Sequence, residues 1–349
     1  MAFKVLSCDG GGIRGYLTCL ILKALQDETG FLDKVDGFFG TSTGGLIAVA
    51  LADGRSQGRD MSALLDEITA IYRHRGDMIF REAERGRIRR LLHALIERSG
   101  RDSGPGLVSS HFTSRGLAEI GATLVADRTL GSILPEIVLA VPAVCLYADD
   151  DTGWAPYSLT NQELRRDGFF DMSDVPLLDI ALATSAAQTF FPPHRIVTPR
   201  RDFGYFTDGG VFANNPVLNG INVAIAAGRA QGLGDIEAMS VGTGLQPSSI
   251  SEEMVKNPDD WGLLKWFGLT SGAPLGALLD LGLTTSAENQ YWIAHLVLDD
   301  RLVRVNPPLP RTVGLTSRDP EAYAMMEHAC RTAMESRSWQ QALDMLRGW

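Results

Sequence analysis

The stretch GTSTG at residues 40–44 decides how this chain folds, because it joins two apolar runs of different character. The first run, 35–39, has the length of a buried strand, and the second, 46–52, has helical character. A strand that turns sharply into a helix at Ser42 presents the serine hydroxyl at the apex, and small residues two before and two after it avoid a collision with both elements. The N–H groups at the start of the helix favour negative charge at that apex. Ser42 is therefore the candidate nucleophile.

The overall composition predicts a globular protein that does not bind nucleic acid. Of the 349 residues, 45% are hydrophobic and 21% are charged, which fits a chain with a sizeable core in one large or two ordinary domains. The net charge of −10 argues against a nucleic-acid polymer as the main partner, because binding to phosphates needs a basic surface.

Cysteine usage and the apolar runs indicate the compartment. The chain contains four scattered cysteines without a C-x-x-C pair, namely Cys8, Cys19, Cys145 and Cys330. Neither a disulfide framework nor a metal site is therefore expected. Residues 1–9 are too short and too weakly apolar for a signal peptide, and no apolar run reaches the roughly 18–20 residues of a membrane-spanning helix. We expect a cytoplasmic protein.

Strand and helix patterns alternate along the chain. Residues 4–8 resemble a short buried strand, 16–27 a helix, and the serine turn follows. Later segments continue the alternation, with strands expected at 137–146 and 238–241 and helices at 179–187 and 217–230. This order predicts an α/β fold with a central, mainly parallel sheet covered by helices on both faces.

We expect a single α/β domain over residues 1–349 with two helical additions, an insertion or cap at about 73–130 and a C-terminal extension at about 250–349. The stretch 73–101 holds nine arginines against four acidic residues, and apolar residues between 88 and 96 follow helical spacing. Such a helix can lie on an anionic membrane or pack on the core with a solvated arginine face. Residues 261–269, with two tryptophans, suit a membrane interface, a core or a dimer contact.

A second glycine-rich motif, DGGGIRG at residues 9–15, contains G-x-G-x-x-G from Gly10 onward. Between a strand and a helix, this pattern can bind a dinucleotide, but that use requires an acidic residue about 20 residues further on, at the end of the second strand. This chain has the serine turn there instead. Unhindered N–H groups near a nucleophilic serine suit an oxyanion hole better.

The serine also needs a base. The six histidines lie outside the glycine-rich and turn motifs, at positions 74, 93, 111, 194, 295 and 328. Asp208 is the stronger candidate, because it follows an apolar strand and begins the tight turn DGG at 208–210. The segment NNP at 214–216 then supplies a cap and a first-turn proline for the next helix. An isolated DGG would be read as a structural turn, but here it occurs together with the other two motifs.

The three motifs in this order, without a placed histidine, resemble the patatin-like phospholipase family of lipid acyl hydrolases. The segment ATSAAQTFFP at 183–192 resembles the one that precedes the aspartate in the family, and VGTG at 241–244 resembles a later strand end. The resemblance covers residues 3–245 and leaves about the last hundred residues without a matching motif.

This resemblance implies a Ser–Asp dyad. Ser42 would attack an ester carbonyl of a glycerolipid, Asp208 would accept the hydroxyl proton, and water would then release the fatty acid from an acyl-enzyme. The backbone N–H groups of Gly11 and Gly12, with Gly10 as a third donor, would hold the oxyanion. No metal and no cofactor is needed.

Other residues in the matching motifs are expected to support these loops. Arg14 would keep the glycine loop in shape or face a lipid phosphate. The supporting glycines are Gly15, Gly40, Gly44, Gly209 and Gly210.

In length and motif layout the chain is similar to compact bacterial members of the family, some of which are anti-phage effectors activated by cyclic nucleotides. This likeness implies a phospholipid membrane surface as partner, peripheral association with it, a small cyclic nucleotide as activator, and a homo-oligomer as a further option. Three alternatives stay open: a Ser-His-Asp esterase, an acyltransferase, and a nucleotide-binding module built on the glycine loop.

Overall fold

A computed structural model describes residues 2–83, 110–147, 154–164, 171–247, 249–266 and 277–349. The strands within these ranges are β1 (Phe3–Cys8), β2 (Gly37–Gly40), β3 (Val138–Tyr147), β4 (Ala155–Thr160), β5 (His194–Val197), β6 (Asp202–Asp208), β7 (Ile236–Val241) and β8 (Leu302–Val305). They form one sheet in the order β5-β6-β3-β2-β1-β7-β8, and β4 also pairs with β3. The run from β3 to β8 is parallel, whereas β4, β5 and β6 pair antiparallel. The predicted mainly parallel sheet is confirmed.

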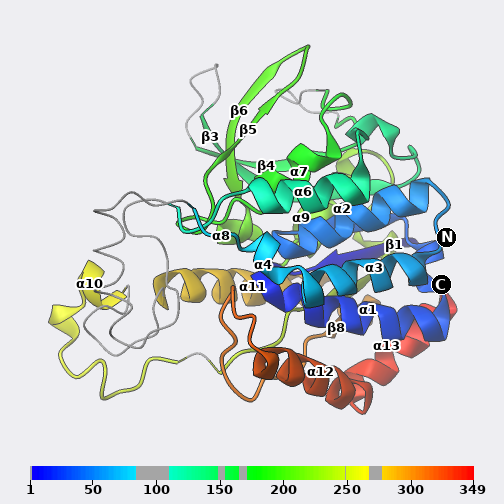
Figure 1. Ribbon diagram of the computed structural model, residues 1–349. Helices are drawn as coiled ribbons and strands as arrows, with labels where there is room; N and C mark the ends of the chain where they lie inside the picture. Colours follow the sequence, from blue (N-terminus) through cyan, green and yellow to red (C-terminus); the bar gives the residue numbers. More distant parts are fainter. Residues whose placement is uncertain (1, 84–109, 148–153, 165–170, 248, 267–276) are drawn as a thin grey trace.

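Helices cover both faces of the sheet (Figure 1). One face packs against α1 (Gly15–Thr29), α2 (Thr43–Ser56), α3 (Met61–His74) and α7 (Leu177–Thr184), and the other against α9 (Val217–Ala226) and α11 (Ala277–Leu298). Successive strand residues alternate between the two cores: Leu6 and Phe38 belong to the first, and Val5 and Phe39 to the second. Because both faces are buried, these strands favour near-continuous apolar runs, as in VLAVPAVCLY of β3, and β1 and β7 are apolar at most positions.

Two segments extend this sandwich. In the described part of 73–130 lie the end of α3, α4 (Gly76–Ile79) and α6 (Arg115–Val125), while the arginine-rich helix expected between 85 and 96 falls outside the described residues. After residue 250 come α10 (Leu263–Trp266), α11, α12 (Pro320–Met334) and α13 (Arg337–Gly348). This C-terminal part, expected to be helical, also contributes β8, which extends the sheet beside β7.

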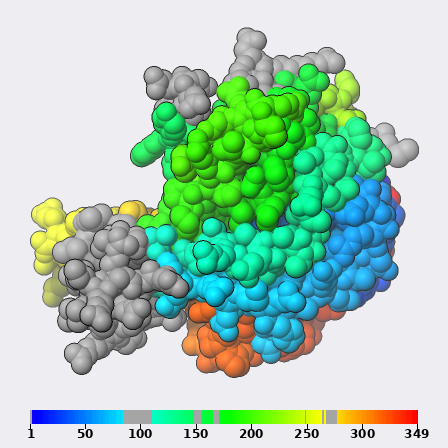
Figure 2. Space-filling model, turned by 45° about the horizontal axis from the view of Figure 1, so that its top comes forward, coloured from blue at the N-terminus to red at the C-terminus, as the bar shows by residue number. Residues whose placement is uncertain are grey.

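Segments that are distant in sequence share one surface. Figure 2 shows residues near 80 (cyan), near 120 (turquoise), near 200 (green) and near 315 (orange) as one continuous face. Within the described ranges, no helix combines the length and apolar character needed to cross a bilayer.

Candidate active site

The turn at Ser42 is sharp and strained. Strand β2 ends at Gly40, helix α2 begins at Thr43, and Ser42 between them has φ 54° and ψ −123°. A non-glycine residue in such a region costs about 1–3 kcal/mol and persists only where its surroundings impose it. A Cβ on Gly40 would lie 2.0 Å from the carbonyl oxygen of Gly44, and one on Gly44 would lie 2.1 Å from that of Cys8. Both positions therefore require glycine, for the steric reason that the motif suggests.

Hydrogen bonds hold the turn from several sides. The Ser42 N–H donates to Thr184 Oγ1 at 2.9 Å, and that hydroxyl donates to the Pro142 carbonyl at 3.0 Å. The hydroxyls of Thr43 and Tyr72 share a hydrogen bond in the buried layer between α2 and α3. The strained backbone of Ser42 is thus fixed by residues of α7, β3 and α3.

Asp208 lies at the end of β6, buried beside Ser42. Its carboxylate accepts a 2.8 Å hydrogen bond from the Gly210 N–H, and the Ser42 side chain in the same cavity favours its charged form. Burial raises the pKa of Asp208 to about 6, although the Ser42 side chain and the Gly210 N–H act in the opposite direction. A carboxylate with this pKa is a stronger base than an exposed aspartate and is still ionised at neutral pH.

Ser42 and Asp208 open into the same cavity, which measures about 990 Å³ including its mouth. Its walls are mostly apolar and include Leu46, Ile79, Phe80, Leu117, Phe190 and Phe191. Helix α11 adds Leu278 and Leu283 from the C-terminal part of the chain. A long apolar chain can be sequestered here with its polar end at the serine.

The glycine loop reaches the cavity with two of its three predicted oxyanion donors. Gly11 and Gly12 line the cavity beside Ser42. The N–H of Gly10 donates instead to the Asn214 carbonyl at 2.9 Å, and Gly10 does not line the cavity. The expected third donor is therefore engaged elsewhere, because Gly10 is packed against the segment that follows Asp208.

Residues near the C-terminus shape this loop. Gly12 has φ +60°, and a Cβ there would lie 2.3 Å from the Leu315 carbonyl oxygen, which also accepts a 2.8 Å hydrogen bond from the Ile13 N–H. The buried Arg14 donates to the Val313 carbonyl at 2.8 Å. Burial lowers the pKa of Arg14 to about 10, against the opposing charge of Asp280. Arg14 does not line the cavity that holds Ser42, and its hydrogen bond ties the glycine loop to the segment around Val313.

The other predicted supporting glycines lie at close contacts. A Cβ on Gly15 would meet Thr43 Oγ1 at 2.3 Å, and one on Gly209 would meet the Pro142 carbonyl carbon at 2.5 Å. On Gly210 it would meet a methyl group of Leu283 at 2.7 Å. The glycine loop, the serine turn and the DGG turn are thus brought together around one cavity.

The described histidines lie away from this cavity. None of the five within the described ranges lines it. His194 pairs with Asp179, with 2.9 Å between Nε2 and Oδ1, and His93 lies outside the described residues. This arrangement gives no support to a Ser-His-Asp triad.

Two residues of the site have no sequence signal. Tyr72 and Leu315 reach the site only through folding, whereas Asn214 and Thr184 lie in motifs that the sequence analysis quotes. The two tryptophans at 261 and 266 pack edge to face, with ring centroids 5.0 Å apart. The structure describes no metal-binding cluster of His, Cys, Asp or Glu in its ranges.

Comparison with known proteins agrees with the architecture of this site. The model of the family described as patatin-like phospholipase matches residues 6–221, which is more than half of the chain. The chain therefore belongs to the patatin-like phospholipase family, and it is a phospholipase of that family.

Two bacterial relatives share most of the chain. A cGAMP-activated phospholipase of Vibrio cholerae serotype O1 is 32% identical over 271 residues, covering 71% of this chain and 67% of the relative. A cGAMP-activated phospholipase of Escherichia coli strain TW11681 is 28% identical over 309 residues, covering 84% and 75%. Among solved structures, VipD of Legionella pneumophila aligns over 96% of this chain and 67% of its own at 13% identity and a TM-score of 0.39, too weak a likeness to bear on the site.

Proposed function

We propose that this chain is a phospholipase A-type lipid acyl hydrolase that cleaves fatty-acyl esters of glycerophospholipids with a Ser42–Asp208 dyad. The observation that supports this most directly is that Ser42 and the buried carboxylate of Asp208 line the same apolar cavity, where the serine side chain favours the charged form of the carboxylate. The cavity favours a long acyl chain, and the dyad supplies a nucleophile and a base.

In the first step, Ser42 Oγ attacks the ester carbonyl carbon and its proton passes to Asp208. The carbonyl oxygen becomes an oxyanion that the N–H groups of Gly11 and Gly12 stabilise, assisted by the N-terminus of α2. The tetrahedral intermediate then collapses. The bond to the lysophospholipid oxygen breaks, and Asp208 returns the proton to that leaving group.

The second step regenerates the enzyme. Asp208, ionised again, takes a proton from a water molecule that attacks the acyl-Ser42 carbonyl. The free fatty acid leaves, and the proton returns to Ser42. Deacylation by an alcohol in place of water would make the same acyl-enzyme an acyltransferase.

The partners and the location of the enzyme belong to this proposal. We infer a small cyclic nucleotide as activator, because the relatives from Vibrio cholerae and Escherichia coli are named cGAMP-activated phospholipases. We also propose that the enzyme is cytoplasmic and binds peripherally to a phospholipid surface as part of a defence response.

The membrane contact is tested by co-sedimentation with anionic and neutral vesicles. Unchanged binding after substitution of Arg89, Arg90, Trp261 and Trp266 together would remove these segments from the membrane contact.

The catalytic claim is tested by profiling the products from mixed phospholipids and by labelling with a fluorophosphonate. The parent protein, with a cyclic dinucleotide supplied, should release fatty acid and be labelled at Ser42. Ser42→Ala and Asp208→Asn should each abolish release, whereas His194→Ala serves as the matched control and should retain it. Release that survives in Ser42→Ala, or is lost in His194→Ala with the fold intact, would contradict the dyad.

A further inference from the structure

The glycine loop is clamped immediately before its oxyanion donors. The Gly10 N–H donates to the Asn214 carbonyl at 2.9 Å, and the Gly10 carbonyl accepts from Thr243 Oγ1 at 3.1 Å. The residue before it, Asp9, is 3% exposed, and its N–H donates to the Val241 carbonyl at 3.0 Å. The orientation of the Gly11 and Gly12 amides therefore depends on how Asp9 and Gly10 are held.

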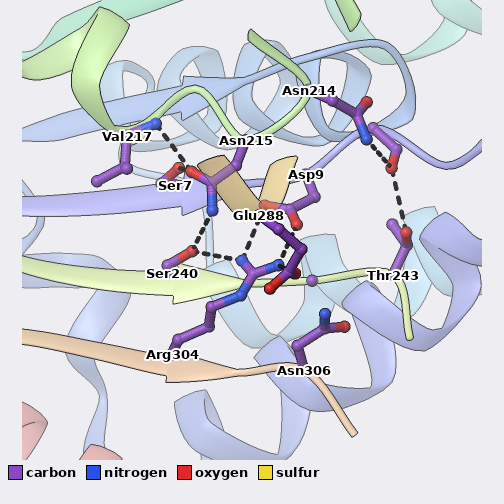
Figure 3. A network of polar contacts seen from close by, with 12 residues as sticks. Ser7, Asp9, Asn214, Asn215, Val217, Ser240, Thr243, Glu288, Arg304 and Asn306 are labelled. Carbon is purple, nitrogen blue, oxygen red and sulfur yellow. Dashed lines mark hydrogen bonds and ion pairs between the residues drawn. The ribbon is translucent and has the colours of Figure 1, made fainter. Parts of the chain in front are cut away.

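Arg304 on β8 is the counter-ion of Asp9 (Figure 3). Its two terminal nitrogens donate to the two carboxylate oxygens at 2.7 Å and 3.2 Å, and both side chains are almost fully buried. Arg304 also donates to Ser240 Oγ at 2.9 Å and lies 3.5 Å from Glu288 of α11. A two-point contact of this kind sets the direction of a carboxylate as well as neutralising it.

Through the Ser240 hydroxyl, the Arg304 guanidinium is also linked to the segment after Asp208. Asn215 donates through Nδ2 to Ser240 Oγ at 3.0 Å, and its Oδ1 accepts from the Val217 N–H at 3.0 Å (Figure 3). The register of the sheet brings these polar side chains together, because Ser7, Ser240 and Arg304 are direct neighbours on β1, β7 and β8. One arginine thus connects the oxyanion loop to the loop that follows the base.

We propose that Arg304 is a positioning residue for acyl transfer, which fixes Asp9 and through it the oxyanion-binding amides of Gly11 and Gly12. This inference rests on the proposed function. It assigns a role in the reaction to β8, which lies outside the residues 6–221 matched by the family model.

Loss of Arg304 leaves a buried carboxylate without its partner. Burial already raises the pKa of Asp9, and Arg304 acts against that rise, so without the arginine the carboxyl takes up a proton or turns away. Misplacing an oxyanion donor affects the transition state more than the bound substrate. We therefore expect Arg304→Gln to lower kcat roughly 10- to 100-fold with KM changed less than about threefold.

Graded variants test the geometry. Arg304→Lys keeps the charge but has no planar fork, so it should recover only part of kcat. Glu288→Gln should have little effect, because this side chain is 35% exposed and lies farther from Arg304 than Asp9 does. Should Arg304→Gln fail to fold, Ser240→Ala removes the link to Asn215 without burying a charge and should still lower kcat.

Arg128→Gln is the matched control. Arg128 pairs with Asp53, another carboxylate that is almost fully buried, and neither residue lines the catalytic cavity. Its loss should lower the melting temperature without lowering kcat. The experiment measures kcat, KM, melting temperature and the rate of fluorophosphonate labelling of Ser42 for each variant.

The expected result is a parallel fall of kcat and labelling rate in Arg304→Gln, partial rescue by lysine, and full activity in Arg128→Gln. Unchanged kcat and labelling in a folded Arg304→Gln, a rise in KM alone, or an equal loss in Arg128→Gln would each overturn the positioning role while Ser42 still labels in the parent. An inactive parent that never labels would overturn the proposed function and this inference with it.

Discussion

The hydroxyl of Thr184 joins the backbone of Ser42 to the neighbouring strand: it accepts from the Ser42 N–H at 2.9 Å and donates to the Pro142 carbonyl at 3.0 Å. Thr184 is the last residue of α7, and the residue whose backbone it holds, Ser42, has a φ of 54°. The strained turn is stabilised from outside its own motif, and the orientation of the nucleophile depends on that support.

Thr184→Val removes this support while keeping the shape of the side chain. We expect a fall in kcat of roughly 10-fold, because the Ser42 N–H and the Pro142 carbonyl lose their partner and the turn can relax. Thr184→Ser keeps the hydroxyl and should stay close to the parent. Steady-state kinetics on a soluble ester measure both, and equal activity of the valine and serine variants would contradict the argument.

The activity should depend on the ionisation of Asp208. Since burial raises the pKa of this carboxyl to about 6, the base is protonated below that pH and ionised above it. The acid limb of the kcat/KM profile should therefore rise with an apparent pKa near 6 and level off above pH 7. A profile that stays flat down to pH 4.5, measured with an ester that does not titrate in this range, would exclude Asp208 as the base.

The raised pKa of Asp208 also makes the free energy of unfolding depend on pH, with the opposite sign to that of an ordinary paired carboxylate. The folded-state pKa of about 6 lies above the unfolded value, so folding favours the protonated form. This favourable contribution is complete below about pH 4 and is lost as the pH rises through 6. Asp208→Asn should therefore be more stable than the parent at pH 7.5, by on the order of 2 kcal/mol, although inactive.

Denaturant unfolding at pH 7.5 and pH 4 measures this difference. The gap between the asparagine variant and the parent should narrow at the lower pH. A variant that is less stable than the parent at pH 7.5 would show that the hydrogen bonds of the carboxylate outweigh its desolvation.

Gly44→Ala should disrupt the turn, because its Cβ would lie 2.1 Å from the Cys8 carbonyl oxygen, on a backbone atom that cannot move aside cheaply. We expect loss of activity and destabilisation of roughly 3 kcal/mol or more, the upper range for a single substitution. Gly234→Ala is the matched control, since nothing lies within 4 Å of its added Cβ. Melting temperature and labelling of Ser42 distinguish the two, and a Gly44→Ala variant that labels normally would contradict the steric argument.

Much of the fold could be predicted from the sequence. Expected strands at 4–8, 137–146 and 238–241 correspond to β1, β3 and β7, and the helices expected at 16–27 and 217–230 to α1 and α9. These elements carry long apolar runs or clear helical spacing, which are local signals. Strands β5 and β8 have only four residues each and lie at the two edges of the sheet, and β4 lies off the main strand order, so their apolar patterns did not stand out.

The turns of the site could be located from local residue patterns, because a serine between tight glycines and an aspartate before two glycines are local turn chemistry. Folding was needed to show that the Gly10 amide bonds to Asn214, that Arg304 holds Asp9, and that the cavity takes part of its wall from α11. Sheet register and helix packing bring together side chains from opposite ends of the chain, and no local pattern encodes which of them will meet.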